Sequence, residues 1–361
     1  MINPPVRYTP DVETIQPDEQ ETIAQLNDAF DVILDRTAED YGHAVRSVHA
    51  KSHGILQGEL VVEEGLPPEL AQGLFATPGT YPVYLRLSTN AGDILPDAVS
   101  LPRGLAIKVL DVEGERLPGA DGATQDFIMV NGKVFQAKTA DKFLGNLKML
   151  AKTTDRMEGT KKVMSAALRG VRHVFEAVGA EAPAAVVSLG GAPQAEPLGE
   201  TYYSTTPFRY GDFMAKFSVI PVAPAMTALT GKEIDIDGRE DAIREDVQTE
   251  MRAIDAVWEF RVQLCRDLEK QPIEDPTVAW DEEEAPFIKV ATIRANAQDS
   301  YDPKLVQSVN EEMRFGIWTG LAAHQPLGNI NRARKDPYRH SADFRAQFNG
   351  CPYHEPTKAN A

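Results

Sequence analysis

Two short stretches of this chain combine a histidine or a tyrosine with nearby arginines, and both have the residue types for proton transfer or anion binding. In the first stretch, Arg46, His49 and His53 lie close together, directly before an apolar run. A histidine titrates near neutral pH and can move a proton during a reaction. A lone histidine beside a strand is more often a structural residue, so both interpretations stay open.

The second stretch lies near the other end of the sequence. Arg334 precedes Tyr338 by four residues, and Arg345 follows Tyr338 by seven. One helical turn would bring the Arg334 guanidinium beside the phenol, although Pro337 makes that helix irregular. A fixed cation beside a phenol favours the ionised form of the phenol. The alternative is a surface tyrosine among arginines.

Two further segments place polar residues where strands are expected. In residues 84–89, alternation puts Arg86 and Ser88 on the same face of a strand. Arg86 pointing into a barrel would need an anion beside it, whereas on a solvated face it would not. Residues 124–132 end in Asn131-Gly132, a pair that is also typical of a hairpin turn.

Helical patterns separate these segments. Apolar residues at helical spacing predict helices over residues 20–36 and 140–179, and the charged run 238–254 predicts a third. Residues 1–18 are rich in proline and polar residues and predict an extended arm. Residues 180–200 are rich in alanine, glycine and proline and predict a loop on the surface.

Strand patterns fall into two groups on either side of the central helical region. Short apolar runs and period-two alternation predict the strands in each group. The first group comprises residues 58–63, 81–88, 104–109 and 127–135, and the second comprises residues 213–219, 258–264 and 287–293. Two strand groups divided by helices indicate an antiparallel sheet or barrel with helical additions, which is an α+β fold.

Composition and charge exclude several classes of protein. The 361 residues are 42% hydrophobic and 25% charged, which is typical of a globular chain, and no apolar run is long enough to span a membrane. The net charge of −17 argues against nucleic-acid binding, and the basic cluster within 161–172 is expected to be a solvated helix face. Two cysteines and a start without a secretory pattern predict a cytoplasmic protein.

Motifs for several common chemistries are missing from the sequence. It has neither a glycine-rich dinucleotide turn nor a phosphate-binding loop. The histidines and cysteines lack zinc-ligand spacing, and the nucleophile elbow of serine hydrolases is absent. A nucleotide enzyme, a zinc enzyme and a serine hydrolase are therefore poor hypotheses.

Taken together and in order, the four segments resemble those of the haem catalase superfamily. Residues 46–54 resemble the stretch that carries the distal histidine, residues 84–89 the Arg-Phe-Ser-Thr strand, and residues 101–108 the Pro-Arg-Gly strand. Arg334, Tyr338 and Arg345 match the Arg-x-x-x-Tyr pattern with its further arginine. Residues 318–332 resemble the hallmark of the small, catalase-related branch. The resemblance covers roughly residues 40–143 and 200–345.

The resemblance implies a catalase-like antiparallel β-barrel surrounded by helices. It implies an N-terminal arm and helix over residues 1–40 and a haem-binding domain over residues 41–361, with a helical or loop insertion at about 140–200. The implied cofactor is haem b with ferric iron. Tyr338 would be its axial ligand and therefore the residue that binds the metal.

The resemblance also implies roles for individual side chains. His49 would be the distal acid–base residue. Asn131 would be the amide that orients the peroxide, although plain register puts Val130 at that position. The residues implied to contact the haem or to support these groups are Arg46, Val48, Arg86, Ser88, Phe143, Arg334 and Arg345.

The implied activity is that of a haem-dependent oxidoreductase that cleaves the O–O bond of a hydroperoxide, as in a catalase-related peroxidase. Its partners would be hydrogen peroxide or an organic hydroperoxide, a small reductant and a second copy of the chain in a homodimer. Two alternatives stay open. One is a fatty-acid hydroperoxide isomerase or allene-oxide-type haem enzyme, and the other is a haem-binding or haem-sensing protein without catalysis.

Overall fold

The computed structural model describes residues 2–153, 165, 168 and 190–356. The helix expected over residues 140–179 is confirmed for α2 (Ala140–Thr153). The rest of that helix, and the basic cluster within 161–172, lie outside the described residues. No helix among the described residues is long and apolar enough to cross a membrane.

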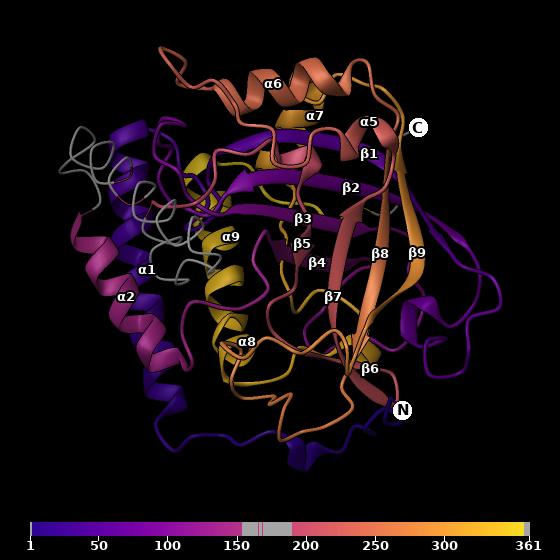
Figure 1. The fold of residues 1–361 in the computed structure, drawn as a ribbon. Helices are drawn as coiled ribbons and strands as arrows, with labels where there is room; N and C mark the ends of the chain where they lie inside the picture. The colour runs from indigo at the N-terminus through magenta and orange to yellow at the C-terminus, as the bar shows by residue number, and fades with distance from the viewer. Residues whose placement is uncertain (1, 154–164, 166–167, 169–189, 357–361) are drawn as a thin grey trace.

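A closed antiparallel β-barrel forms the centre of the molecule (Figure 1). The strands follow the order β5-β4-β3-β2-β1-β9-β8-β7, and the pairing of β5 with β7 closes the ring. The short strand β6 pairs with β7 in an antiparallel hairpin. Closure leaves the ring without an open edge. The expected α+β class with an antiparallel barrel is confirmed. The strands are β1 (Ser52–Val62), β2 (Thr80–Thr89), β3 (Arg103–Val109), β4 (Gln125–Val130), β5 (Tyr202–Tyr203), β6 (Phe208–Tyr210), β7 (Phe213–Pro221), β8 (Ala256–Leu264) and β9 (Phe287–Ala295).

Strand alternation separates the barrel interior from an outer face that is also buried. Leu85 pairs with Ile107, which pairs with Phe127, and the Phe127 ring contacts Phe217 and Phe260 of the opposite strands. This row therefore faces the interior. The next row has the opposite orientation, and in it Arg86 pairs with Ala106, which pairs with Ile128. Arg86 points to the outer face of the barrel.

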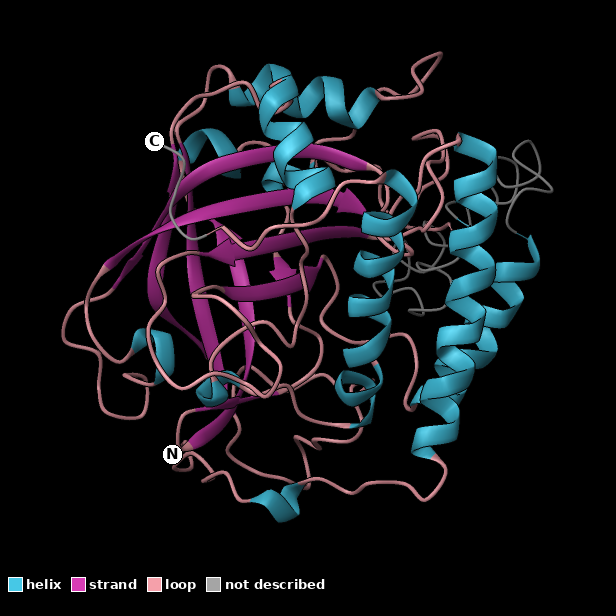
Figure 2. Ribbon diagram, turned by 180° about the vertical axis from the view of Figure 1, so that it is seen from behind, coloured by secondary structure: helices cyan, strands magenta, loops and turns pink. Residues whose placement is uncertain are grey.

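Helices cover this outer face. On one side of the barrel, α1 (Glu19–Tyr41) and α2 lie side by side, and α9 (Lys335–Asn349) runs between them and the barrel (Figures 1 and 2). The apolar faces of α1 and α2 form a second cluster of buried residues that includes Leu26, Phe30 and Leu144. The remaining α-helices are α5 (Pro224–Thr227), α6 (Ala242–Met251), α7 (Pro303–Gln307) and α8 (Asn329–Ala333).

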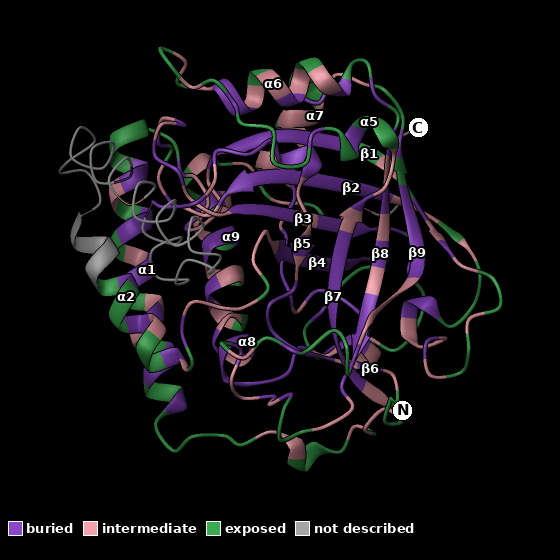
Figure 3. Cartoon of the chain, in the orientation of Figure 1, coloured by how far each residue is buried: buried purple, intermediate pink, exposed green. Residues whose placement is uncertain are grey.

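Single turns of tighter or wider helix complete the described elements. Four are 3₁₀-helices, η1 (Pro10–Val12), η2 (Gly73–Phe75), η3 (Pro197–Gly199) and η5 (Ala322–His324), and one is a π-helix, η4 (Ser308–Glu312). Burial follows the barrel, whose strands are largely enclosed, whereas the outward faces of α2 and α6 are exposed (Figure 3). The domain boundary expected at residue 40 stays a prediction.

Two expectations, one about a strand and one about a loop, were wrong in part. The strand expected over residues 127–135 ends at Val130. Residues 190–199 were expected to form a surface loop, but they pack inside the protein, and Leu198 is fully buried. The irregularity expected near Pro337 is observed at Arg334, where α8 ends and α9 begins, and Pro337 itself is the third residue of α9, where a missing N–H is tolerated.

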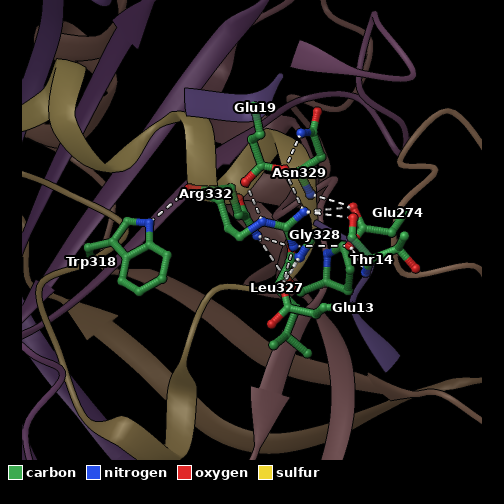
Figure 4. A network of polar contacts seen from close by, with 11 residues as sticks. Glu13, Thr14, Glu19, Glu274, Trp318, Leu327, Gly328, Asn329 and Arg332 are labelled. Carbon is green, nitrogen blue, oxygen red and sulfur yellow. Dashed lines mark hydrogen bonds and ion pairs between the residues drawn. The ribbon is translucent and has the colours of Figure 1, made fainter. Parts of the chain in front are cut away.

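The N-terminal arm is held by one arginine on α8. The Arg332 guanidinium donates to the carboxylates of Glu13, Glu19 and Glu274, and its Nε lies 2.7 Å from Glu19 Oε1 (Figure 4). These three carboxylates come from the arm, the start of α1 and the segment before β9. Arg332 therefore joins parts of the chain that are distant in sequence.

Candidate functional site

A cavity lies on the outer face of the barrel, between β2, β3, β4 and α9. Most of the site residues expected from the sequence line it, namely Arg46, Val48, His49, Arg86, Ser88, Tyr338 and Arg345. Segments separated by almost 300 residues therefore meet at this cavity.

His49 is positioned by an unusual backbone conformation and by two neighbours on the barrel. Its φ angle is 55°, in the left-handed region, just before β1 begins. Its Nδ1 lies 3.0 Å from Ser88 Oγ on β2. The ring also packs on Gly104, where a Cβ atom would lie only 2.5 Å from the ring atoms. A side chain at position 104 would displace the imidazole.

The electrostatic surroundings keep the His49 imidazole neutral. Burial, followed by the cations of Arg86, Arg334 and Arg46, lowers the pKa of His49 to about 3. The imidazole of His49 is therefore uncharged at neutral pH and stays so until the pH falls to about 3. A neutral ring has one nitrogen free to accept a proton.

Tyr338 is the first-turn tyrosine of α9, and Arg334 at the junction of α8 and α9 fixes its phenol. Arg334 donates to the Tyr338 oxygen over 2.9 Å, and its guanidinium carbon lies 5.3 Å from the centre of the ring. A second, longer hydrogen bond of 3.4 Å joins Arg334 to the buried Asn331. The helical-turn contact expected from the spacing is confirmed.

Three arginines, which we call the arginine triad, converge on one side of the cavity: Arg46, Arg86 and Arg345. The side chains of Arg86 and Arg345 are buried, with 2% and 4% of their surface exposed. The triad donates to main-chain carbonyls and to the side-chain amide of Asn310. Within the described residues, no carboxylate lies within 4.0 Å of any triad nitrogen to form an ion pair.

The triad cations repel one another. Burial and the charge of Arg345 lower the pKa of Arg86 to about 9, and burial together with both other triad members lowers that of Arg46. Glu311 attracts all three, but its carboxylate is 2.9 Å from His43. In addition, Arg345 Nε is buried and has no hydrogen-bond partner among the described residues. Such a cluster is electrostatically suited to a ligand with more than one anionic group.

Three sequence-predicted residues do not line the cavity: Asn131, Phe143 and Arg334, the last of which contacts Tyr338 instead. The Asn131 side chain accepts from the Arg103 amide over 2.8 Å and donates to Glu200 over 2.8 Å, so both ends of its amide are engaged. Phe143 on α2 packs at 5.4 Å from the Phe135 ring and joins the cluster between the outer helices. Val48 packs against the same cluster while also lining the cavity.

Sequence reasoning missed several residues of the site. Arg314 and Phe315 line the cavity, and Phe315 lies under the Arg46 guanidinium at 6.0 Å. Asn310 bonds every member of the triad. Asn310 and Arg314 belong to a polar run whose sequence has no periodic or motif signal, so only the fold identifies them.

Comparison with known proteins gives one clear result. No protein-family model matches the chain, and no curated protein matches it in sequence. Solved structures do match: a fungal catalase aligns with a TM-score of 0.60 over 87% of this chain and 62% of that chain, at 16% identity. The chain has a catalase-like fold.

Two further structures agree with this result. Catalase A from Saccharomyces cerevisiae aligns with a TM-score of 0.59 over 88% of this chain and 65% of that chain, at 17% identity. A bacterial catalase aligns with a TM-score of 0.55 over 87% and 60%, at 16% identity. The chain thus spans less than two thirds of the length of these catalases. The catalase-like fold agrees with the fold that the four motifs imply.

The residues at the cavity fit the haem that those motifs imply. A haem carries two carboxylates, and the arginine triad offers cations that have no carboxylate partner among the described residues. A phenol held by an arginine and a neutral imidazole line the same cavity. Apolar side chains, among them Leu105, Ile128 and Met129, line its barrel side.

Proposed function

We propose that this protein is a haem-dependent oxidoreductase that processes hydroperoxides, in the manner of a catalase-related peroxidase. One observation supports this proposal above the others. His49, the Arg334–Tyr338 pair and the arginine triad, all expected from sequence motifs, meet around a single cavity on a catalase-like barrel.

The proposed cofactor is haem b with ferric iron. Tyr338 would bind the iron through its phenol oxygen, and the Arg334 guanidinium, 2.9 Å away, would orient that oxygen. The arginine triad would bind the two haem carboxylates by charge-assisted hydrogen bonds. When bound, the haem supplies the electron-rich iron at which a hydroperoxide O–O bond is cleaved.

His49 is the proposed proton-transfer residue. If Ser88 Oγ accepts a hydrogen bond from Nδ1–H, Nε2 keeps the lone pair that takes a proton from the hydroperoxide. The same nitrogen then returns the proton to the departing oxygen. The low pKa of His49 keeps it in the proton-accepting form across the physiological range, and Ser88 and Gly104 fix the ring orientation.

The proposed substrates are hydrogen peroxide or an organic hydroperoxide, with a small reductant as second substrate. The amide role expected for Asn131 would require its side chain to leave both Arg103 and Glu200. We therefore assign the proton step to His49 without an amide partner. The homodimer and the cytoplasmic location stay predictions.

The test compares the haem-loaded protein with two histidine variants. We expect His49→Ala to lose about 10²- to 10⁴-fold in turnover of hydrogen peroxide while it retains haem, because general acid–base catalysis contributes that much. His354→Gln is the control, since the His354 side chain is exposed and does not line the cavity. Unchanged turnover in His49→Ala would remove the proposed acid–base role and favour a non-catalytic haem-binding protein.

Product analysis separates the activities. Oxygen release indicates dismutation of peroxide, and oxidation of an added phenolic donor indicates peroxidase chemistry. The second candidate function, a fatty-acid hydroperoxide isomerase, is favoured by the apolar lining at Leu105, Ile128 and Met129. It predicts consumption of a lipid hydroperoxide without donor and without oxygen release.

A further inference from the structure

Asn310 is the point at which all three triad arginines meet. Its side-chain oxygen accepts from Arg86 Nε over 2.9 Å, and its carbonyl accepts from Arg345 over 2.7 Å and from Arg46 over 2.9 Å. Its side-chain nitrogen donates to Ser52 Oγ over 3.1 Å. One residue thus fixes three guanidinium groups that lie on β2, on α9 and before β1.

The local helix geometry makes this arrangement possible. Asn310 is the central residue of the π-helix η4, and Arg46 also bonds the carbonyls of Val309 and Met313 beside it. A π-turn leaves carbonyl groups outside the regular helical pattern, and such turns are frequent at functional sites. Here these carbonyls act as acceptors for cations.

The side chain of Asn310 carries no charge, and this matters because three arginine cations surround it. The titratable groups that act on the triad are its own members, Glu311, Tyr301 for Arg86 and Cys351 for Arg345. A carboxylate at position 310 would form ion pairs with the triad and reduce the positive charge available to a ligand. An amide orients the guanidinium groups without cancelling their charge.

We propose that Asn310 is a positioning residue that aims the arginine triad at the carboxylates of the bound ligand while leaving its charge intact. The inference rests on the proposed haem site and concerns how that site recognises the acidic edge of the porphyrin. It assigns to Asn310 a role in ligand affinity instead of a role in stability of the unloaded protein.

The test uses purified apo-protein, haem and haem dimethyl ester, in which both carboxylates are blocked. In Asn310→Asp, we expect haem affinity to fall by about tenfold or more, because the new carboxylate competes for the triad. Affinity for the dimethyl ester should change less than about twofold. The thermal midpoint of the apo-protein should rise, because the new charge relieves repulsion among three cations.

Two further variants complete the experiment. Asn296→Asp makes the same charge change at an exposed site and should alter none of the three quantities. Asn310→Ala keeps the backbone acceptor but removes the Arg86 acceptor, so haem affinity should fall about threefold while affinity for the ester is retained. This variant also covers the case in which Asn310→Asp does not fold.

The outcomes separate the inference from the proposed function. Equal losses for haem and its ester, or a lower thermal midpoint in Asn310→Asp with haem affinity unchanged, would overturn the positioning role. If the wild-type protein itself binds haem and ester equally, the triad does not bind carboxylates and the proposed haem site fails. A wild-type preference for haem that persists unchanged in Asn310→Asp and Asn310→Ala would reject only the role of Asn310.

Discussion

The partly buried Arg332 and the arginine triad have opposite kinds of hydrogen-bond partner: charged carboxylates in the first case and neutral groups in the second. The Arg332 guanidinium is surrounded by the carboxylates of Glu13, Glu19 and Glu274, which raise its pKa far above the usual value (Figure 4). Among the described residues, the triad has only neutral acceptors within hydrogen-bond distance, and burial lowers the pKa values of all three members.

The difference indicates which cluster is structural and which awaits a ligand. A buried ion pair is complete within the protein, and breaking it leaves an uncompensated charge. A buried cation with neutral partners is half of an ion pair, which an anion from outside can complete. The Arg332 network fastens the N-terminal arm, whereas the triad borders the cavity.

The largest expected effect is on stability at the Arg332 network. Arg332→Ala should lower the free energy of unfolding of the apo-protein by about 3–5 kcal/mol, because it leaves carboxylates facing one another without their cation. Urea denaturation measures this. Arg239→Ala is the control, since Arg239 also bonds two carboxylates but at a more exposed site, and should cost less than about 1 kcal/mol. If Arg332→Ala and Arg239→Ala lost equal free energy of unfolding, the Arg332 network would contribute no more than an exposed ion pair, and its structural role would be contradicted.

The triad should respond in the opposite way. Arg86→Met should leave the free energy of unfolding of the apo-protein unchanged or higher by about 1 kcal/mol, because it removes a repelling charge and keeps an apolar side chain. Its haem affinity should fall by about 30-fold, which corresponds to about 2 kcal/mol. Urea denaturation and haem titration give the two values. A loss of several kcal/mol in the apo-protein would make the triad structural.

A smaller effect is expected on the titration of His49. Its folded-state pKa of about 3 lies below the ordinary value of about 6.5, so between these pH values the unfolded chain binds a proton that the folded chain does not. His49 therefore costs stability as the pH falls from about 6.5 toward 3. In Arg86→Met the pKa should rise by about one unit, since one nearby cation is gone.

Nuclear magnetic resonance of the imidazole in the apo-protein measures this shift, and Arg239→Ala is the variant that should leave it unchanged. A His49 pKa near 6.5 in the wild-type protein would show that the triad and burial do not act on the ring. An unshifted pKa in Arg86→Met would remove Arg86 as a cause.

The sequence predicted every barrel strand except β5, and seven of the ten site residues expected from it line the cavity. Alternation placed Arg86 and Ser88 on one face of β2, and the spacing of Arg334 and Tyr338 predicted their contact. Period-two alternation could not reveal that both faces of β2 are buried, because it only distinguishes one face from the other. The outer face of β2 is buried because helices cover it, and strand alternation does not show where those helices lie.

Other parts of the site could not be predicted because they depend on tertiary contacts. Asn310 stands in a charged run without periodicity, and its role follows from a π-turn and three arginines from distant segments. Asn131 was assigned by motif, but β4 ends at Val130 and the Asn131 side chain turns to Arg103 and Glu200. Its role as a distal amide is a prediction that these contacts do not support.

The most direct test of the haem site is the absorption spectrum of the haem-loaded protein beside that of Tyr338→Phe. We expect the wild-type protein to give the spectrum of a high-spin ferric haem bound by tyrosinate, and the variant to lose it while its β-barrel stays folded. A wild-type spectrum without a tyrosinate ligand, or an identical spectrum in Tyr338→Phe, would contradict the assignment of this cavity.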